Sequence, residues 1–385
     1  MTSIMRGYVM IKGEKMNKWK LDFDEMILHF PEIKELENIE QNPKYHGEGN
    51  VFIHTQMVCK ALKGFDEWEE LNEQEQLILY LAGLFHDLGK KVCTKIIEGE
   101  LVSPKHAVIG AKMFRELLYK KYGECYGIDF DTRENIAKLI RYHGLPLLFM
   151  EKKYMTYEMI KASECVDMKL LYLLAKADLL GRICTDQSIL LEQVMYFKEY
   201  AIELGCYKEK RQFANSYTRF LYLNYNSIWY GDEVFDNRQF KVIMMVGIPL
   251  AGKDSYIEKN FKDLPVISLD DIRKELKIDP KDGSKKVVTI AKERAKELLR
   301  KKQSFVWNAT NIMKDTRQKL CQLFSDYGAV VEYIYLEVPY SEILKRYKKR
   351  ERVVPIEVID HMIKKMDMIE AWEGDKVTKV VQFKN

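Results

Sequence analysis

A short apolar run that ends in a glycine-rich turn constrains the fold of this 385-residue chain more than any other feature. Residues 241–246 (KVIMMV) predict a buried strand, and GIPLAGK follows, with glycines at Gly247 and Gly252 and a lysine at Lys253. This is the GxxxxGK pattern of a phosphate-binding loop, in which backbone N–H groups at the start of a helix surround phosphate oxygens. The lysine reaches the β- and γ-phosphates of such a ligand. The pattern therefore predicts an α/β domain that binds ATP with Mg²⁺.

One position of this loop departs from the usual pattern. Asp254 stands where a Ser or Thr usually ligates Mg²⁺, and Ser255 follows it. A carboxylate can bind Mg²⁺, although it places negative charge beside the triphosphate. Ser255 can instead supply the hydroxyl, as the shifted hydroxyl of adenylate-kinase-like loops suggests. The predicted ATP-binding residues of the loop are Gly247, Gly252, Lys253, Asp254 and Ser255.

Further apolar runs at 266–268, 304–310 and 330–338 alternate with amphipathic stretches such as 284–302. This alternation predicts a parallel sheet with crossover helices. In such a sheet, the residues that follow the strands gather at the edge where ligands bind. Asp270 follows the second strand, so its carboxylate is placed to accept a proton from an attacking hydroxyl.

A basic segment near the C-terminus runs from Leu344 to Arg352 (LKRYKKRER). It can close over a triphosphate, with Arg346 or Arg350 stabilising the transferred phosphoryl group. The alternative is a solvated helix face. From residue 241 onward Lys and Arg outnumber Asp and Glu by 30 to 22, whereas the whole chain carries only +4, which weakly favours a polyanionic partner.

The first part of the chain has a different pattern. Runs at 74–89, 107–123, 133–144 and 167–182 carry apolar residues at three- and four-residue spacing, which predicts helices. Convincing strand alternation is scarce before residue 235. The expected domains are therefore an all-helical domain at 1–235 and an α/β domain at 236–385, both with enough apolar residues for a core, since 47% of the chain is hydrophobic.

Histidines and aspartates form a recurring set in the helical part. They are His54, His86, Asp87, His106, His143 and Asp178. Imidazole and carboxylate groups together suit Mn, Fe, Co, Ni, Zn or Mg. Asp178 lies in the apolar run LLYLLAKADLL, where a buried carboxylate needs a metal ion or a basic partner.

The order His54, His86-Asp87-x-Gly-Lys90, Asp178, together with the stretch YHGEGNVFIHT, resembles the HD superfamily of metal-dependent phosphohydrolases over about residues 40–185. The resemblance implies an all-helical HD fold with these four residues as ligands of a divalent transition metal. It places His106 and His143 as further ligands in members with two ions, with Asp87 bridging. Lys90 and Arg182, one turn beyond ligands, would then contact phosphate or else serve as helix-end charges.

Four elements of the α/β part resemble the phage-type polynucleotide 5′-kinase family over about residues 240–368. These are the phosphate loop, the Asp-Asp-x-Arg segment, the TN strand end at 310–311 and the basic segment followed by Val-Pro. The resemblance implies that Lys253 contacts ATP, Asp270 is the general base and Arg273 holds the phosphate of the acceptor. Arg350 best matches the lid arginine, with Arg346 second. Asn308 stands where that family often has Asp.

Together the two halves resemble the bacterial bifunctional HD-domain polynucleotide kinase–phosphatases. This resemblance implies an RNA end-healing enzyme that acts on nucleic-acid ends, RNA or DNA: an ATP-dependent 5′-hydroxyl kinase joined to a 2′,3′-cyclic phosphodiesterase and 2′(3′)-phosphatase, with a separate RNA ligase as partner. Two alternatives remain open. One is an HD nucleotidase fused to a small-molecule nucleoside or nucleotide kinase, and the other is an ATP-sensing, RNA-binding regulatory protein with a decayed loop.

Cysteine content and hydropathy indicate the compartment. Seven scattered cysteines form no CxxC pair, which is typical of proteins in a reducing cytosol. The longest apolar runs fall well short of the ~20 residues that a membrane span needs. We therefore expect a cytoplasmic protein without a membrane partner.

Overall fold

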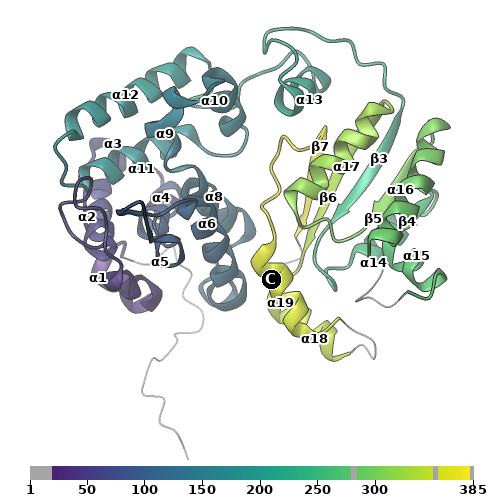
Figure 1. Ribbon diagram of the computed structural model, residues 1–385, viewed down its shortest axis with the longest axis horizontal. Coiled ribbons are helices and arrows are strands. Elements are labelled where there is room, and N and C mark those ends of the chain that lie inside the picture. The colour runs from purple at the N-terminus through teal and green to yellow at the C-terminus, as the bar shows by residue number, and fades with distance from the viewer. Residues whose placement is uncertain (1–19, 279–283, 350–353, 382–385) are drawn as a thin grey trace, which may run out of the picture. The chain divides into compact units, whose positions relative to one another are not determined.

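The computed structural model describes residues 20–278, 284–349 and 354–381. Two compact units make up the chain. The first comprises Met1–Leu147 and Leu170–Met195, and the second comprises Leu148–Lys169 and Tyr196–Asn385. Figure 1 shows helical elements in purple to teal and a sheet with its helices in green to yellow, which confirms the predicted fold class.

Helices dominate the chain as far as residue 235. In order they are α1 (Phe23–His29), the 3-10 helix Pro31–Asn38, α2 (Val51–Lys63), α3 (Asp66–Glu69), α4 (Glu73–Phe85), α5 (Lys90–Cys93), α6 (His106–Leu117) with a π-turn at Leu118–Tyr122, α7 (Gly123–Tyr126), α8 (Phe130–Tyr142), α9 (Leu145–Leu148), the 3-10 helix Phe149–Glu151, α10 (Met155–Ser163), α11 (Met168–Leu180), α12 (Gln187–Glu203) and α13 (Ser216–Tyr225). The four predicted helical runs correspond to α4, α6, α8 and α11.

Helix α4 forms the centre of the helical core. It packs against α2 and α8, and every residue from Leu77 to Phe85 is buried. A capping box starts the helix, in which the Asn72 side chain accepts from the backbone N–H of Glu75 and the Glu75 side chain accepts from that of Asn72. His86 and Asp87 follow directly, so the apolar helix carries the first site residues into the protein interior.

One small hairpin interrupts the helices. Strands β1 (Lys95–Ile97) and β2 (Glu100–Val102) pair antiparallel around a two-residue turn. Glu98 and Gly99 both adopt positive φ, 51° and 84°, as such a turn requires. Its short strands are mostly exposed, so they lack the apolar alternation that predicts a strand.

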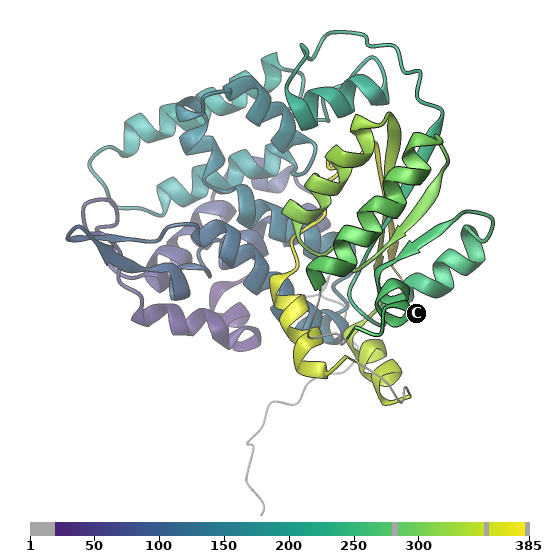
Figure 2. The ribbon, with the colours of Figure 1, turned by 45° about the vertical axis from the view of Figure 1, so that its right-hand side comes forward.

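The second unit contains a parallel five-stranded sheet. Its strands are β3 (Phe240–Val246), β4 (Val266–Ser268), β5 (Phe305–Asn308), β6 (Ala329–Glu337) and β7 (Lys376–Val381), in the spatial order β4-β5-β3-β6-β7. The accompanying helices are α14 (Lys253–Asn260), α15 (Leu269–Glu275), α16 (Ser284–Arg300), α17 (Lys314–Asp326), α18 (Tyr340–Lys348) and α19 (Ile356–Lys365). Helix α14 contacts β5, α16 contacts β4 and α17 contacts β6; Figure 2 shows the sheet with its helices from a second side. The strand predicted at 241–246 is thus central and almost wholly buried.

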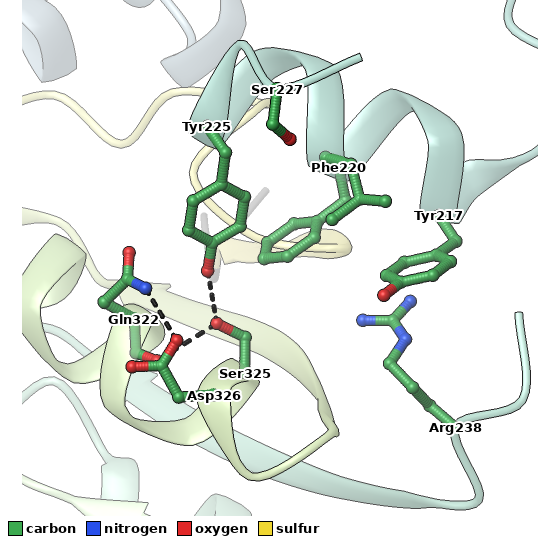
Figure 3. A pocket seen from close by; sticks show the side chains of 9 residues that line it. Tyr217, Phe220, Tyr225, Ser227, Arg238, Gln322, Ser325 and Asp326 are labelled. Atoms are coloured by element: carbon green, nitrogen blue, oxygen red, sulfur yellow. Dashed lines mark hydrogen bonds between the residues drawn. The ribbon is translucent and has the colours of Figure 1, made fainter. Parts of the chain in front are cut away.

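Helix α13 packs against the sheet domain within the second unit. The hydroxyl of Tyr225 is hydrogen-bonded to Ser325 at the end of α17, and the Asn224 amide donates to the Trp372 carbonyl at 2.8 Å. A cavity of about 340 Å³ lies between α13 and α17, and there the Arg238 guanidinium lies 4.0 Å from the ring centre of Tyr217. Figure 3 shows the side chains that line this cavity. The boundary predicted near residue 235 stays a prediction, because each compact unit consists of two separate segments of the sequence.

No helix in the described part of the chain combines the length and hydrophobicity needed to cross a lipid bilayer.

Candidate metal centre and phosphate-binding loop

The six predicted ligands meet in one cluster of the helical unit. His54 comes from α2, His86 and Asp87 follow α4, and Asp178 lies on α11. The Nε2 atom of His54 lies 3.0 Å from an oxygen of Asp178 and 3.2 Å from Nε2 of His86. Nε2 of His86 in turn lies 3.2 Å from Oδ2 of Asp87. Four side chains from three separate segments of the chain thus direct their donor atoms to one point.

The other two histidines join this cluster on the far oxygen of Asp87. Nε2 of His106 lies 3.4 Å from Oδ1 of Asp87 and 3.2 Å from Nε2 of His143. Asp87 therefore directs one oxygen to each group of histidines, which is the arrangement expected of a bridging ligand.

Backbone carbonyls orient all four rings. Nδ1 is hydrogen-bonded to Gly181 O for His54, Gly83 O for His86, Ser103 O for His106 and Ile140 O for His143, at 2.7–3.0 Å. Nδ1 therefore carries the proton, and the lone pair of Nε2 faces the cluster. Two such lone pairs 3.2 Å apart repel each other unless a cation lies beside them. The donor set consequently fits one or two divalent metal ions.

The charges of the cluster favour metal ligation. Burial alone would raise the pKa values of both carboxylates, but Lys90 holds that of Asp87 well below its usual range and Arg182 does the same for Asp178. Burial, reinforced by the neighbouring histidines, lowers the pKa of His143 to about 3. Near neutral pH the aspartates are thus ionised and His143 is an unprotonated donor.

Lys90 and Arg182 lie beside the cluster. Nζ of Lys90 is 2.7 Å from Oδ2 of Asp87 and donates to Gln41 at 2.6 Å. The Arg182 guanidinium binds both oxygens of Asp178. In this structure both cations neutralise predicted ligands, and their contact with a phosphate stays a prediction.

A close approach of two backbones brings His106 to the cluster. A Cβ atom on Gly89 would lie 2.1 Å from the carbonyl oxygen of His106 and 2.7 Å from the backbone nitrogen of Gly110. Only glycine fits there without displacing α6. The glycine of the His-Asp-x-Gly-Lys motif therefore positions the second group of ligands.

Sequence reasoning missed Glu48 as a site residue. Its Oε1 lies 2.8 Å from Nδ1 of His46 and 3.1 Å from Nδ1 of His54, while Oε2 accepts from the backbone of Ile183 at 2.9 Å. Its side chain is 1% exposed. Glu48 thus fixes a ligand ring from behind, as carboxylates often do at metal sites. The signal was present in the stretch YHGEGNVFIHT, which contains all three side chains.

The phosphate-binding loop links β3 to α14 in the second unit. Gly247 and Gly252 adopt φ of 156° and 100°, and Lys253 is the first residue of α14. Nζ of Lys253 donates to the loop carbonyls of Gly247 at 2.9 Å and Ile248 at 3.0 Å. Burial lowers the pKa of Lys253 to about 8, against the opposing effect of Asp254 and Asp270. The loop thus places a lysine at the start of a helix, a position that favours anions, and its contact with a triphosphate stays a prediction.

The predicted catalytic carboxylate lies on the same side as the loop. Asp270 is the second residue of α15, directly after β4, and its side chain is 87% exposed. Its charge acts on Lys253, and NH1 of Arg273 lies 3.5 Å from Oδ1 of Asp270. Asp270 is therefore open to an acceptor, whereas its role as a general base stays a prediction.

Asp254 and Ser255, the two candidate Mg²⁺ ligands of the loop, differ in their surroundings. The amide of Asn308, at the end of β5, donates to Oδ1 of Asp254 at 2.8 Å. Ser255 is exposed on the first turn of α14. The unusual carboxylate of the loop therefore has a defined partner.

The basic segment reaches the loop through Arg346 of α18. NH1 of Arg346 donates to Leu250 O at 2.9 Å, and Nε donates to Glu342 at the same distance. Arg350, the better match for a lid arginine, lies outside the described residues.

Comparisons with known proteins agree with this geometry. Residues 51–171 match the HD domain family, and residues 242–369 match an AAA domain family. One similar solved structure is described as a "putative kinase" from Chloroflexus aurantiacus j-10-fl, with 16% identity, 38% of this chain and 86% of that chain covered, and a TM-score of 0.31. A search of curated proteins finds no match. Residues 51–171 are thus similar to HD domains, and residues 242–369 are similar to AAA domains of the P-loop kinase-like type.

Proposed function

We propose that this protein heals broken RNA ends, acting as a 5′-hydroxyl polynucleotide kinase and as a metal-dependent 2′,3′-cyclic phosphodiesterase and 2′(3′)-phosphatase. The observation that carries the proposal is the presence of two clusters of candidate functional side chains in one chain. One is the cluster of six predicted ligands around Asp87, and the other is the phosphate-binding loop with Asp270 beside it.

The helical unit would hydrolyse the 3′ end. A divalent ion held by the cluster lowers the pKa of water and polarises phosphate oxygens. The chain's own contribution is to hold the ligands ionised and oriented through the carbonyls behind each histidine. Lys90 and Arg182 would bind the phosphate of the RNA end, because both cations border the cluster.

The sheet domain would phosphorylate the 5′ end. Lys253 and the loop N–H groups bind the phosphates of ATP, and Asp270 accepts the proton of the attacking 5′-hydroxyl. Arg273 lies beside Asp270 and holds the adjacent phosphate of the acceptor, while Arg346 stabilises the transferred group. The basic surplus from residue 241 onward supports a polyanionic acceptor.

The two reactions complement each other chemically. Cleavage of RNA by a metal-independent endonuclease leaves a 2′,3′-cyclic phosphate on one end and a 5′-hydroxyl on the other. A ligase that joins a 3′-hydroxyl to a 5′-phosphate cannot use either end. A chain that repairs both would supply such a ligase, which we expect as its separate partner.

The test uses an RNA that ends in a 5′-hydroxyl and a 2′,3′-cyclic phosphate. This RNA is incubated with the full chain, ATP and Mg²⁺, and in parallel samples with Mn²⁺, Ni²⁺, Co²⁺, Fe²⁺ or Zn²⁺ added. Both termini are followed by mass spectrometry. Lys253→Met should abolish only 5′ phosphorylation, and Asp178→Asn only 3′ phosphate release. Lys259→Met and Asp66→Asn, on exposed helix positions, are the matched controls.

Other outcomes would overturn the proposal. A strong preference for free nucleosides over oligonucleotides would indicate the small-molecule kinase. If the chain binds RNA but transfers a phosphoryl group to no acceptor, the result would indicate the ATP-sensing regulatory protein. Loss of both activities would indicate a structural role or misfolding, and in a variant that still unfolds cooperatively it would overturn the assignment of two separate reaction centres.

A further inference from the structure

The phosphate-binding loop and the strand beside it carry an exchanged pair of side chains. In P-loop proteins a loop Ser or Thr hydroxyl and a carboxylate at the end of a neighbouring strand hold Mg²⁺. Here the loop supplies the carboxylate, Asp254, and the strand supplies a neutral amide, Asn308. As in the usual pair, one of the two side chains is negatively charged, but here the charge lies on the loop residue Asp254 and not on the strand residue Asn308.

Sheet register brings the two residues together. β5 runs parallel to β3, with Trp307 opposite Met244, so Asn308 lies at the strand end next to the loop. Asn308 is 9% exposed, and Nδ2 donates to Oδ1 of Asp254 at 2.8 Å. The bond orients the carboxylate through Oδ1 and leaves Oδ2 as a donor atom for a ligand. Asp254 lies directly after Lys253, beside the position of the triphosphate.

The amide at position 308 also has an electrostatic reason. An Asp there would place a second carboxylate at hydrogen-bond distance from Asp254, and two such groups cannot both stay ionised at low cost. An Asn side chain instead donates a hydrogen bond to Asp254 and adds no second negative charge. The two substitutions therefore compensate each other.

We infer that Asp254 is the carboxylate that ligates the Mg²⁺ of the bound nucleotide, and that Asn308 is its positioning residue. The inference rests on ATP binding by the kinase-like domain and does not depend on the acceptor. It has a distinctive consequence, because an ionised Asp254 repels a bare triphosphate and attracts one that carries Mg²⁺. ATP binding should therefore depend on Mg²⁺ more strongly than in a loop with a hydroxyl.

The experiment measures binding of a non-hydrolysable ATP analogue to the full chain by calorimetry, in Mg²⁺ and in EDTA, without any acceptor. In Mg²⁺, Asp254→Ser should weaken binding by about tenfold, and in EDTA the same variant should bind more tightly than the wild type. Asn308→Asp should weaken binding in both conditions. The double variant Asp254→Ser/Asn308→Asp should recover most of the Mg²⁺-dependent affinity, since it restores one hydroxyl and one carboxylate.

Asp263→Ser, an exposed position after α14, is the matched control and should bind like the wild type. Equal effects of Asp254→Ser in Mg²⁺ and in EDTA would overturn the inference, as would a double variant no better than the worse single one. A wild-type chain that binds no nucleotide in either condition would overturn the proposed kinase function as well. Thermal unfolding of each variant shows which losses come from the fold, and the sign change in EDTA cannot arise from misfolding.

Discussion

At the scale of single residues, the hydrogen bonds that Lys253 makes without nucleotide must be exchanged for bonds to phosphate when a nucleotide binds. Its ammonium group donates to two carbonyls of its own loop, Gly247 and Ile248. A triphosphate offers the same group stronger, charged acceptors. Binding therefore exchanges neutral partners for anionic ones and changes the proton affinity of the side chain.

The first prediction concerns the pH dependence of ATP affinity. Burial lowers the pKa of Lys253 to about 8 without nucleotide, and a bound triphosphate raises it. Above about pH 8 the free protein carries fewer protons than the complex, so binding takes up a proton and affinity falls as the pH rises. Calorimetry in two buffers of different ionisation enthalpy measures this uptake. Lys253→Arg, which stays charged, should show no uptake, and equal uptake in both proteins would contradict the prediction.

The second prediction concerns Glu48. Glu48→Gln replaces the carboxylate behind His54 by an amide, which weakens the hydrogen bond to Nδ1 and the hold on the ring. Metal affinity should fall about 10- to 100-fold. Metal content after dialysis against a graded chelator measures the change. Glu98→Gln, at the exposed hairpin turn, serves as control, and unchanged metal retention by Glu48→Gln would refute the positioning role.

The ligands of the cluster could be named from the sequence, but their supporting contacts could not. Each of the six ligands is a residue type with few other reasons to lie in an apolar helix or at its end. The carbonyls behind the rings carry no signal of residue type. Glu48 was missed although it lies in the stretch YHGEGNVFIHT, because its place behind the His54 ring also depends on a tertiary contact with the backbone of Ile183, 135 residues later.

At the scale of elements, glycine contacts decide how α6 lies against the motif after α4. Gly89→Ala should destabilise the helical unit by about 1–3 kcal/mol and move His106 away from Asp87, because the added Cβ overlaps the His106 carbonyl. Chemical unfolding and metal stoichiometry measure the two effects. Gly64→Ala, where the nearest atom lies 3.5 Å from the new Cβ, should leave both unchanged. A Gly89→Ala protein with full stability and full metal loading would contradict this.

A buried ion pair joins α17 to the segment after α19. Arg317 is fully buried and donates to Glu373, to Asn311 O and Ile312 O in the turn after β5, and to Met368 O. That turn also contacts the loop, since Thr310 O accepts from the backbone N–H of Gly247. The pair thus supports the phosphate-binding loop from beneath.

Removing one partner should therefore be costly. Glu373→Gln leaves the Arg317 charge uncompensated, which should lower the free energy of unfolding of the second unit by about 3–5 kcal/mol. Denaturant unfolding followed by hydrogen exchange of the sheet measures the loss. Glu332→Gln, at a partly exposed position on β6, is the control, and its effect should be within about 0.5 kcal/mol.

Element types followed closely from the sequence where periodicity is strong. The predicted strands at 241–246, 266–268, 304–310 and 330–338 correspond to β3, β4, β5 and β6. Strand β7 was missed because it is a partly exposed edge strand whose lysines interrupt the apolar pattern. Edge strands and short hairpins depend on tertiary pairing more than on local composition.

At the scale of the whole molecule, the chain distributes its two sites over separate compact units. The residues of the metal cluster all lie in the first unit, and the loop, Asp254, Asp270 and Asn308 lie in the second. The change from helical periodicity to strands alternating with helices predicts two domains but not this discontinuity, in which 148–169 group with the second unit and 170–195 with the first. Helices with similar apolar spacing lie on both sides of residues 148, 170 and 196, so no local sequence pattern marks where one unit ends and the other begins.

Separate units predict independent ligand binding. Lys253→Met should leave metal content unchanged, and His86→Ala should leave ATP affinity unchanged, because the two sites share no residue. Elemental analysis and calorimetry on the same preparations test both statements. A loss of more than about tenfold at the unmutated site would show that the sites are coupled.

The shared carboxylate of Asp87 has a thermodynamic consequence. Because its two oxygens serve different groups of histidines, whichever ion arrives first changes the field that the next one meets. Loading should then follow two unequal stoichiometric steps instead of one hyperbola. A protein with one bound ion would be a species distinct from the fully loaded one, and the free metal concentration would set its fraction.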